Sequence, residues 1–385
     1  MSRQSAVPVR WRLPLLAAGG VALLGGLYAA LVLLDLPLPD TPPGLGQVHG
    51  PVMVFGFVGT LVALERAVAV RARWGLLAPG CSGLGAVIML ADGPSLVGRL
   101  LLSVAGVLLL GVYVALWRRQ AGVALLVQAA GAGCWYAATL LWLGDLPTNQ
   151  IVSWLAGFVV LTIAGERLEL AQAGLTRRVS SRRTIEGWCL AAAGAVLAGA
   201  AASLLWPQPG YRLWGLALIG LVAWLAVFDI ARHTIHGRSL PRYVAAGLLA
   251  GYGWLALAGL LWAGRGATTD GPRYDAILHA VFLGFTMSMI FAHAPVILPA
   301  VLRRPLPYHP VLYVPLMLLH LSLAARLGLG DWGGLISVWR WAGVADEVAV
   351  VGFAACAAVL TLRAGRNART ARPGAVPGSP VAAGR

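Results

Sequence analysis

The sequence contains no lysine and few charged residues, and both shortages narrow the class of protein. Charged side chains make up 11% of the 385 residues, whereas a soluble domain averages about a quarter. All 29 basic residues are arginines and only 14 residues are acidic, which gives a net charge of +15. The composition excludes an ordinary soluble enzyme.

The basic excess does not predict a nucleic-acid partner. The arginines stand in short clusters between apolar segments, and no basic stripe with interleaved aromatic residues forms a stacking groove. Cysteine is also scarce. The four cysteines form neither a CxxC metal pair nor a CxxCH haem attachment, so we interpret each as a small buried hydrophobe. They are Cys81, Cys134, Cys189 and Cys356.

Long apolar runs are abundant. Hydrophobic residues make up 59% of the chain, and the mean hydropathy is +0.79. The apolar runs are about 20 residues long, the length that a helix needs to cross a bilayer. We therefore predict an all-α polytopic membrane bundle of about twelve transmembrane helices. The predicted spans are 12–34, 48–70, 75–92, 97–117, 121–143, 151–172, 187–206, 212–231, 243–263, 275–301, 308–328 and 344–364.

The loops between these spans are short, so residues 1–364 are predicted to form one transmembrane domain. Residues 365–385, rich in Arg, Gly, Pro and Ala, are predicted to be a disordered cytoplasmic tail. With the N-terminus inside, 23 arginines fall on the inner side and six on the outer side. This bias predicts a multi-pass protein of the bacterial inner membrane with both termini in the cytoplasm.

Histidines at membrane depth are the main functional candidates, because ionisable groups there are costly. His49 and His279 each begin a span at its outer end, and His320 is predicted to lie at a similar depth. His293 and His309 are predicted to form a looser inner pair. The two remaining histidines, His233 and His236, lie in an arginine-rich loop and are interpreted as solvated surface.

Two imidazoles from different helices at one depth are the ligand set of a six-coordinate b-type haem. This pattern predicts His49 and His279 as the axial ligands. The alternative is that each histidine forms a hydrogen bond to a serine or a carbonyl of a neighbouring helix.

Methionines on the same helix face as three of the histidines suggest copper as a second cofactor. Met53 lies four residues after His49. Met317 lies three residues before His320, and Met289 lies four before His293. A thioether with an imidazole suits copper(I). His320 with Met317 is therefore a candidate copper site and His293 a further candidate metal ligand, while the alternative for the methionines is core filling.

Two Glu-Arg pairs, Glu65-Arg66 and Glu166-Arg167, stand at the inner ends of even-numbered spans. They are interpreted as interfacial ion pairs that anchor the bundle. The functional alternative is a carboxylate at a proton-entry point from the cytoplasm.

Two segments resemble a known family. The tenth span begins HAVFLGFTMSM, and its His279, Ala280, Gly284 and Met289 resemble the late conserved segment of the NnrS family. The second span contains VHGPVMVFGFVG, which resembles the early motif of that family. The resemblance implies a twelve-span membrane protein with haem and copper that is associated with nitric oxide and nitrosative stress. The same arrangement of histidines also resembles subunit one of the haem-copper oxidases, in which the second and tenth helices each supply a haem ligand.

This sequence departs from both patterns. Pro51 and Val52 stand where the NnrS motif has its second histidine and its glutamate, and the His-His pair of an oxidase copper site is missing. The resemblance therefore implies a haem-binding relative, with or without copper, rather than a complete oxygen-reducing centre. It leaves open whether the protein is an oxidoreductase of the haem-copper type.

The sequence supports three functional hypotheses. The first is a membrane haem protein in nitric oxide or respiratory redox chemistry, with quinol or cytochrome c as the electron donor and a gas such as nitric oxide as its ligand. The second is a proton-coupled twelve-span transporter that uses His293, Glu65 or Glu166. The third is a non-catalytic factor that handles metal or assembles another membrane complex.

Overall fold

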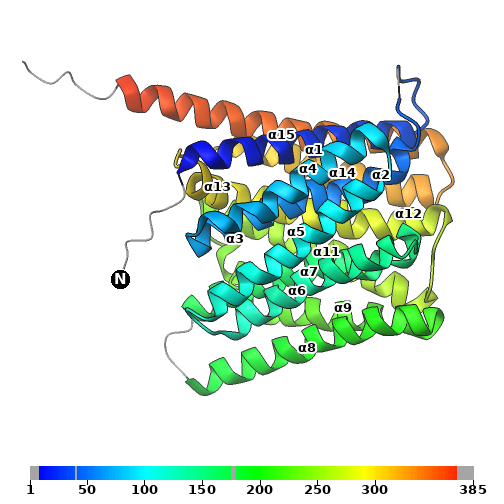
Figure 1. Cartoon of the computed structure of the whole chain (residues 1–385), viewed down its shortest axis with the longest axis horizontal. Coiled ribbons are helices and arrows are strands. Elements are labelled where there is room, and N and C mark those ends of the chain that lie inside the picture. The colour runs from blue at the N-terminus through cyan, green and yellow to red at the C-terminus, as the bar shows by residue number, and fades with distance from the viewer. Residues whose placement is uncertain (1–7, 40, 175–178, 371–385) are drawn as a thin grey trace, which may run out of the picture.

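The computed structural model describes residues 8–39, 41–174 and 179–370, and within these ranges every regular element is a helix. Figure 1 shows the long helices running side by side in one bundle. The elements are α1 (Val9–Leu33), α2 (Leu45–Pro51), η1 (Val52–Gly59), α3 (Thr60–Val70), η2 (Arg73–Leu76), α4 (Leu77–Asp92), α5 (Leu96–Trp117), α6 (Val123–Leu143), η3 (Thr148–Gln150), α7 (Val152–Gly174), α8 (Val179–Leu205), α9 (Pro207–Phe228), α10 (Ala231–Thr234), α11 (Ser239–Arg265), α12 (Gly271–His279), η4 (Ala280–Met287), α13 (Ser288–Leu302), η5 (Pro310–Leu312), α14 (Tyr313–Ala325), η6 (Arg326–Asp331) and α15 (Ile336–Thr370).

The predicted fold class, an all-α polytopic membrane bundle, is confirmed. Eleven helical segments of the described chain are long and apolar enough to cross a bilayer. A helix satisfies its backbone hydrogen bonds internally, which is the reason that a chain with such apolar runs takes this form in lipid. Several of these segments join two or three consecutive elements, so that α2, η1 and α3 form one span, as do α12, η4 and α13.

The predicted span 151–172 corresponds to α7, which is not among the eleven segments. At 23 residues α7 is long enough to span a bilayer, but Glu166, Arg167 and Glu169 lower its hydropathy. Most of its side chains from Val152 to Leu168 are nevertheless buried among the other helices. The count of twelve spans stays a prediction.

The two ends of the bundle are distinguished by the chain ends. The helix α1 begins, and α15 ends, at the same end of the bundle, as Figure 1 shows. We name this the arginine end, because the predicted inner loops lie there, and the opposite end the histidine end. Which end faces the cytoplasm stays a prediction. Arg3, Arg177, Arg178 and most of the predicted tail (371–385) lie outside the described residues.

The spans that carry His49 and His279 lie in the centre of the bundle. In the most apolar window of Leu45–Val70, 67% of the residues are buried, and in that of Gly271–Leu302 the share is 56%. These are the two highest values among the eleven segments. Both spans begin at the histidine end, where α2 and α12 appear in Figure 1. The predicted common depth of the two histidines therefore agrees with the fold.

Three spans contain a π-helical segment, which the sequence analysis did not predict. The segments are η1, η4 and η6. A π-helix joins each N–H to the carbonyl five residues back, and such segments are rare and frequent at functional sites. η1 begins three residues after His49 and η4 one residue after His279. The unusual backbone thus follows the candidate haem ligands directly.

Local hydrogen bonds explain how these wide turns are tolerated. Pro51 has no N–H, so the helical ladder is interrupted near the start of η1. The Ser82 hydroxyl of α4 donates to the Phe55 carbonyl in η1 at 2.7 Å. In η4 the Thr286 hydroxyl donates to the Val281 carbonyl at 3.0 Å. Side chains therefore satisfy carbonyls that the altered ladder leaves open.

Candidate functional site

His49 of α2 and His279 of α12 both lie at the histidine end. Each Nδ1 donates to a backbone carbonyl at 2.8 Å, that of Gly26 for His49 and that of Asp275 for His279. A carbonyl can only accept a hydrogen bond, so in both neutral rings the proton is on Nδ1 and the lone pair is on Nε2. Neither Nε2 forms a hydrogen bond within the described chain.

This is the state in which an imidazole binds a metal. A ligating histidine almost always donates its other N–H to a carbonyl or carboxylate, which fixes the tautomer and the ring orientation. The donor set at this point therefore fits two axial ligands of a haem.

The Asp275 carboxylate holds His279 from its second side. It lies 3.2 Å from the Nδ1 atom of His279 and receives hydrogen bonds from Arg326 at 3.0 and 3.2 Å. Trp339 of α15 donates to the same carboxylate at 3.0 Å, and the Arg326 guanidinium lies 5.2 Å from the Trp339 ring centroid. These contacts join α12, η6 and α15, and a carboxylate partner increases the basicity of a ligating imidazole.

Further carboxylates lie near this cluster. Asp331 and Asp346 are buried, and each has an oxygen without a hydrogen-bond partner in the described chain. The other Asp346 oxygen accepts a hydrogen bond from the Ser322 hydroxyl. Both carboxylates interact electrostatically with Arg326 and His279. Buried acceptors normally have donors, so this region offers sites for protons or water beside the two histidines.

His320 has a different environment from the other two outer histidines. The indole of Trp254 donates to its Nδ1 at 2.9 Å, and the two rings are stacked. Nδ1 is therefore the acceptor, and the ring proton is on Nε2, which is buried without a partner. Trp254 packs on Gly284 of η4, where a Cβ would lie 2.4 Å from it. Met317 is 51% exposed, on the outside of the bundle.

The predicted inner pair is also divided between two environments. His309 is exposed, and its Nδ1 accepts from the Val311 N–H at the start of η5. His293 is part-buried on α13, with Nδ1 bonded to the Met289 carbonyl at 2.7 Å and Nε2 3.1 Å from Arg167. His293 thus has partners for both nitrogens, and no contact joins it to His309.

Arg167 belongs to a buried ion-pair network. Its guanidinium makes two hydrogen bonds to Asp229 at 2.5 and 3.0 Å, and the side chains are only 3% and 2% exposed. The Tyr252 hydroxyl and the Ala231 N–H donate to the same carboxylate at 2.8 and 2.6 Å. The network ties α7 to α11 and to the segment after α9, and sequence analysis did not identify Asp229.

The two predicted Glu-Arg pairs meet through Arg66. Its guanidinium lies 2.6 Å from Glu65 and 3.5 Å from Glu166, so that α3 and α7 are joined near the arginine end. Next to them is a cavity of about 530 Å³. Its walls are almost entirely apolar, and its ionisable lining residues are Glu65, Glu166 and His293. The walls come from α1, η1, α3, α7, η4, α13 and α15.

Groups of three or more His, Cys, Asp or Glu side chains that could hold a metal ion do not occur in the described part of the chain. A haem needs only two protein ligands, so this finding does not bear on the pair of His49 and His279. The four cysteines are free thiols.

The profile of DUF8744, a domain of unknown function, matches residues 12–362. The chain belongs to this family. The matched residues contain the whole cluster of His49, Asp275, His279 and Arg326, as well as the cavity with its carboxylates. A comparison with curated proteins gives no match. The site of this DUF8744 member therefore has to be interpreted from its own residues.

Sequence analysis missed several residues of the site. The sequence analysis singles out neither Arg326 nor Asp275, although Asp275 stands four residues before His279 on the same helix face. That spacing was the available signal for Asp275. The Gly26 carbonyl had none, because any residue supplies a carbonyl and only the packing of α1 on the second span brings this one to His49.

Proposed function

We propose that this protein binds a b-type haem between His49 and His279 and acts in electron transfer within the membrane. The observation that carries the proposal is the pair of imidazoles at the histidine end, each with its Nδ1 proton bound to a carbonyl. The resemblance to the NnrS family supports nitric oxide or respiratory redox chemistry as the setting. When bound, a bis-histidine haem takes up and releases one electron.

The residues around the pair have definable tasks in this proposal. Gly26 and the Asp275 carbonyl hold the imidazoles in the tautomer that presents Nε2. The Asp275 carboxylate increases the basicity of His279, and Arg326 neutralises the charge of that carboxylate.

The test is a pyridine haemochrome spectrum of protein purified from haem-replete cells. We expect a Soret band and a b-type spectrum, with pigment that acidified acetone removes. His49→Ala and His279→Ala should each abolish the low-spin spectrum. The exposed His233→Ala is the matched control and should retain it. Haem that is lost only with His293→Ala would move the site to the cavity and contradict the assignment.

Copper held by His320 and Met317 is a separate part of the proposal, and its support is the resemblance and the ligand chemistry alone. Elemental analysis tests it. Copper that disappears in His320→Ala, with the haem spectrum unchanged, would support this site. Fewer than about 0.1 copper atoms per chain, an order-of-magnitude limit for specific binding, would refute the copper site.

A second candidate function is proton-coupled transport, which the cavity favours. An apolar cavity of about 530 Å³ with two carboxylates on its wall is large enough for a small solute, and membrane carboxylates often carry protons. A Cβ at Gly20, which lines the cavity, would meet no atom within 4 Å, so Gly20→Leu fills the space without a backbone clash.

Proteoliposomes with an internal pH dye distinguish the two functions. A transporter gives a colourless preparation and solute-driven proton flux that falls at least tenfold in Gly20→Leu and in Glu166→Gln. Gly194→Leu is the matched control, because Gly194 is an exposed helical glycine on α8 with equally open space. A red preparation with no flux would exclude the transport hypothesis.

A further inference from the structure

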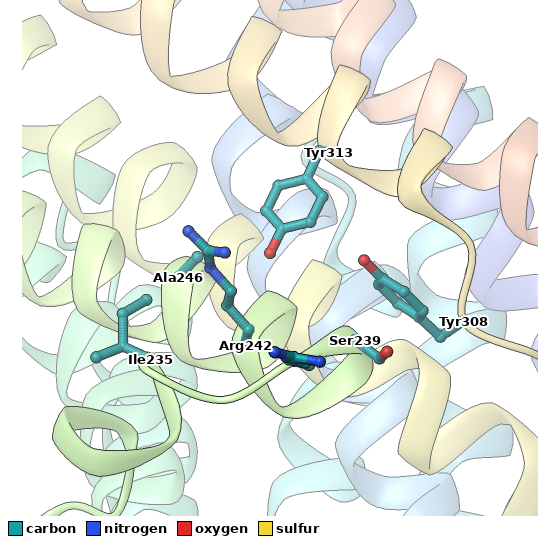
Figure 2. Close-up of a pocket in the computed structure, with 7 residues that line it drawn as sticks. Ile235, Ser239, Arg242, Ala246, Tyr308 and Tyr313 are labelled. Carbon is teal, nitrogen blue, oxygen red and sulfur yellow. The ribbon is translucent and has the colours of Figure 1, made fainter.

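A second cavity lies at the arginine end and differs from the first in its lining. It has a volume of about 470 Å³ and lies between the start of α11 and the start of α14. Figure 2 shows its side chains converging from these two elements and from the loop before η5. The lining residues are Ile235, Arg238, Ser239, Arg242, Ala246, Tyr308 and Tyr313.

The polar groups of this cavity favour an anion. Two guanidiniums, two phenol hydroxyls and one serine hydroxyl line it, and no carboxylate does. Neither Arg238 nor Arg242 forms an ion pair with an acidic residue of the described chain. An arginine fork with unused donors is suited to phosphate oxygens.

The tyrosines are held in place by a third ring. Tyr243 of α11 is fully buried and packs against Tyr308 and Tyr313, with ring centroids 6.3 and 5.1 Å apart. Neither lining hydroxyl forms a hydrogen bond within the described chain. In Figure 2 the hydroxyls of Tyr308 and Tyr313 point toward the space between the two rings. They are therefore positioned donors with no acceptor of their own.

The backbone adds to this bias. The helix α11 begins at the cavity and has no side-chain cap on its first turn. Its 27 residues give a full helix dipole whose positive end faces the cavity. Ser239 has a φ of 55°, in the left-handed region that side chains rarely adopt. No side-chain cap therefore occupies the first turn of α11 beside the cavity.

We infer that this cavity binds the phosphate group of an anionic phospholipid. The cavity lies at the ends of two membrane spans, where lipid headgroups are present, and basic pockets between spans bind such headgroups. The apolar Ile235 and Ala246 form the rest of the wall, which suits the glycerol backbone and the first methylenes of an acyl chain. A soluble phosphate would use the same donors but would gain nothing from this apolar wall.

Lipid binding to the purified full chain in detergent tests the inference, with native mass spectrometry as the readout. Phosphatidylglycerol should bind at least tenfold more tightly than phosphatidylcholine. Arg238→Gln with Arg242→Gln should weaken phosphatidylglycerol at least tenfold. Ala246→Leu, which fills the cavity without changing charge, should weaken it as well and covers the case in which the arginine variant folds poorly.

The matched control is Arg71→Gln with Arg73→Gln, two exposed arginines where α3 ends and η2 begins, in another loop at the arginine end. This variant has the same net charge and should change affinity less than twofold. Equal losses in both double variants would show diffuse charge attraction and overturn the site. Inorganic phosphate that displaces the lipid at equal concentration would show a soluble ligand and overturn the lipid assignment. The inference does not depend on haem.

Discussion

The buried pair of Arg167 and Asp229 makes a quantitative prediction about stability. Asp229 accepts four hydrogen bonds, two from Arg167 and one each from Tyr252 and the Ala231 N–H. In Asp229→Ala the Arg167 guanidinium, only 3% exposed, loses its carboxylate partner and keeps the hydrogen bond to His293. Removing one partner of a buried ion pair typically costs about 3–5 kcal/mol, because the other charge stays buried.

The matched control is the pair of Arg99 and Asp145. Their atoms also lie 3.0 Å apart, but Asp145 is 89% exposed. Exposed pairs contribute about 0–1 kcal/mol, so Asp145→Ala should leave the free energy of unfolding nearly unchanged. The assay is equilibrium unfolding in mixed micelles with increasing SDS, followed by tryptophan fluorescence.

A double variant separates pairing from packing. Replacing both partners, as Arg167→Leu with Asp229→Leu, removes the unpaired charge and should recover at least half of the lost stability. If the free energies of unfolding of Asp229→Ala and Asp145→Ala differ by less than about 1 kcal/mol, the ion pair of Arg167 and Asp229 is not desolvated in the bundle and the reasoning is refuted.

Three further predictions test the packing, the haem environment and the topology. A Cβ on Gly210 would lie 2.4 Å from the backbone of Ala202, so Gly210→Ala should destabilise the protein by about 1–3 kcal/mol in the same SDS titration. Gly194→Ala is the control and should leave stability unchanged, because the space around Gly194 is open. Equal effects of the two substitutions would show that α8 and α9 do not pack this closely. A Cβ on Gly26 would lie 2.5 Å from the Met53 sulfur, so Gly26→Leu should push α1 away from the second span and lengthen the hydrogen bond from His49 to the carbonyl of residue 26. Haem per chain should then fall at least threefold relative to Gly194→Leu, and unchanged haem would show that this hydrogen bond is dispensable. In a cysteine-free background, Thr234→Cys should react with a membrane-impermeant maleimide only from the cytoplasmic side and Thr148→Cys only from outside, and the reverse pattern would invert the orientation predicted from the arginines.

The helices were predictable because an apolar run in lipid must satisfy its backbone hydrogen bonds internally, which a helix does. Each predicted span coincides with a described helix, including 151–172 with α7. The π-helices were not predictable from periodicity, since η1 and η4 are apolar on all sides and depend on hydroxyls such as that of Ser82 from another helix.

The site was predictable in part for a similar reason. Depth along a helix can be counted from sequence, and it brought His49 and His279 together as axial candidates. Depth does not determine the partner of a side chain, which is why His320, at the same predicted level, lies against Trp254. Asp229 and Asp275 stand near the ends of spans, where charged residues are common as topology signals. Their roles became clear only from their partners Arg167 and Arg326 on other helices.

The most direct test of the central proposal is the absorption spectrum of the purified protein and of two single variants. The account predicts a low-spin b-type haem spectrum in the native chain, with about one haem per chain expected for two axial ligands. It predicts that His49→Ala and His279→Ala each lose this spectrum while remaining folded by SDS titration. A colourless native protein from haem-replete cells, or a spectrum that survives both substitutions, would contradict it.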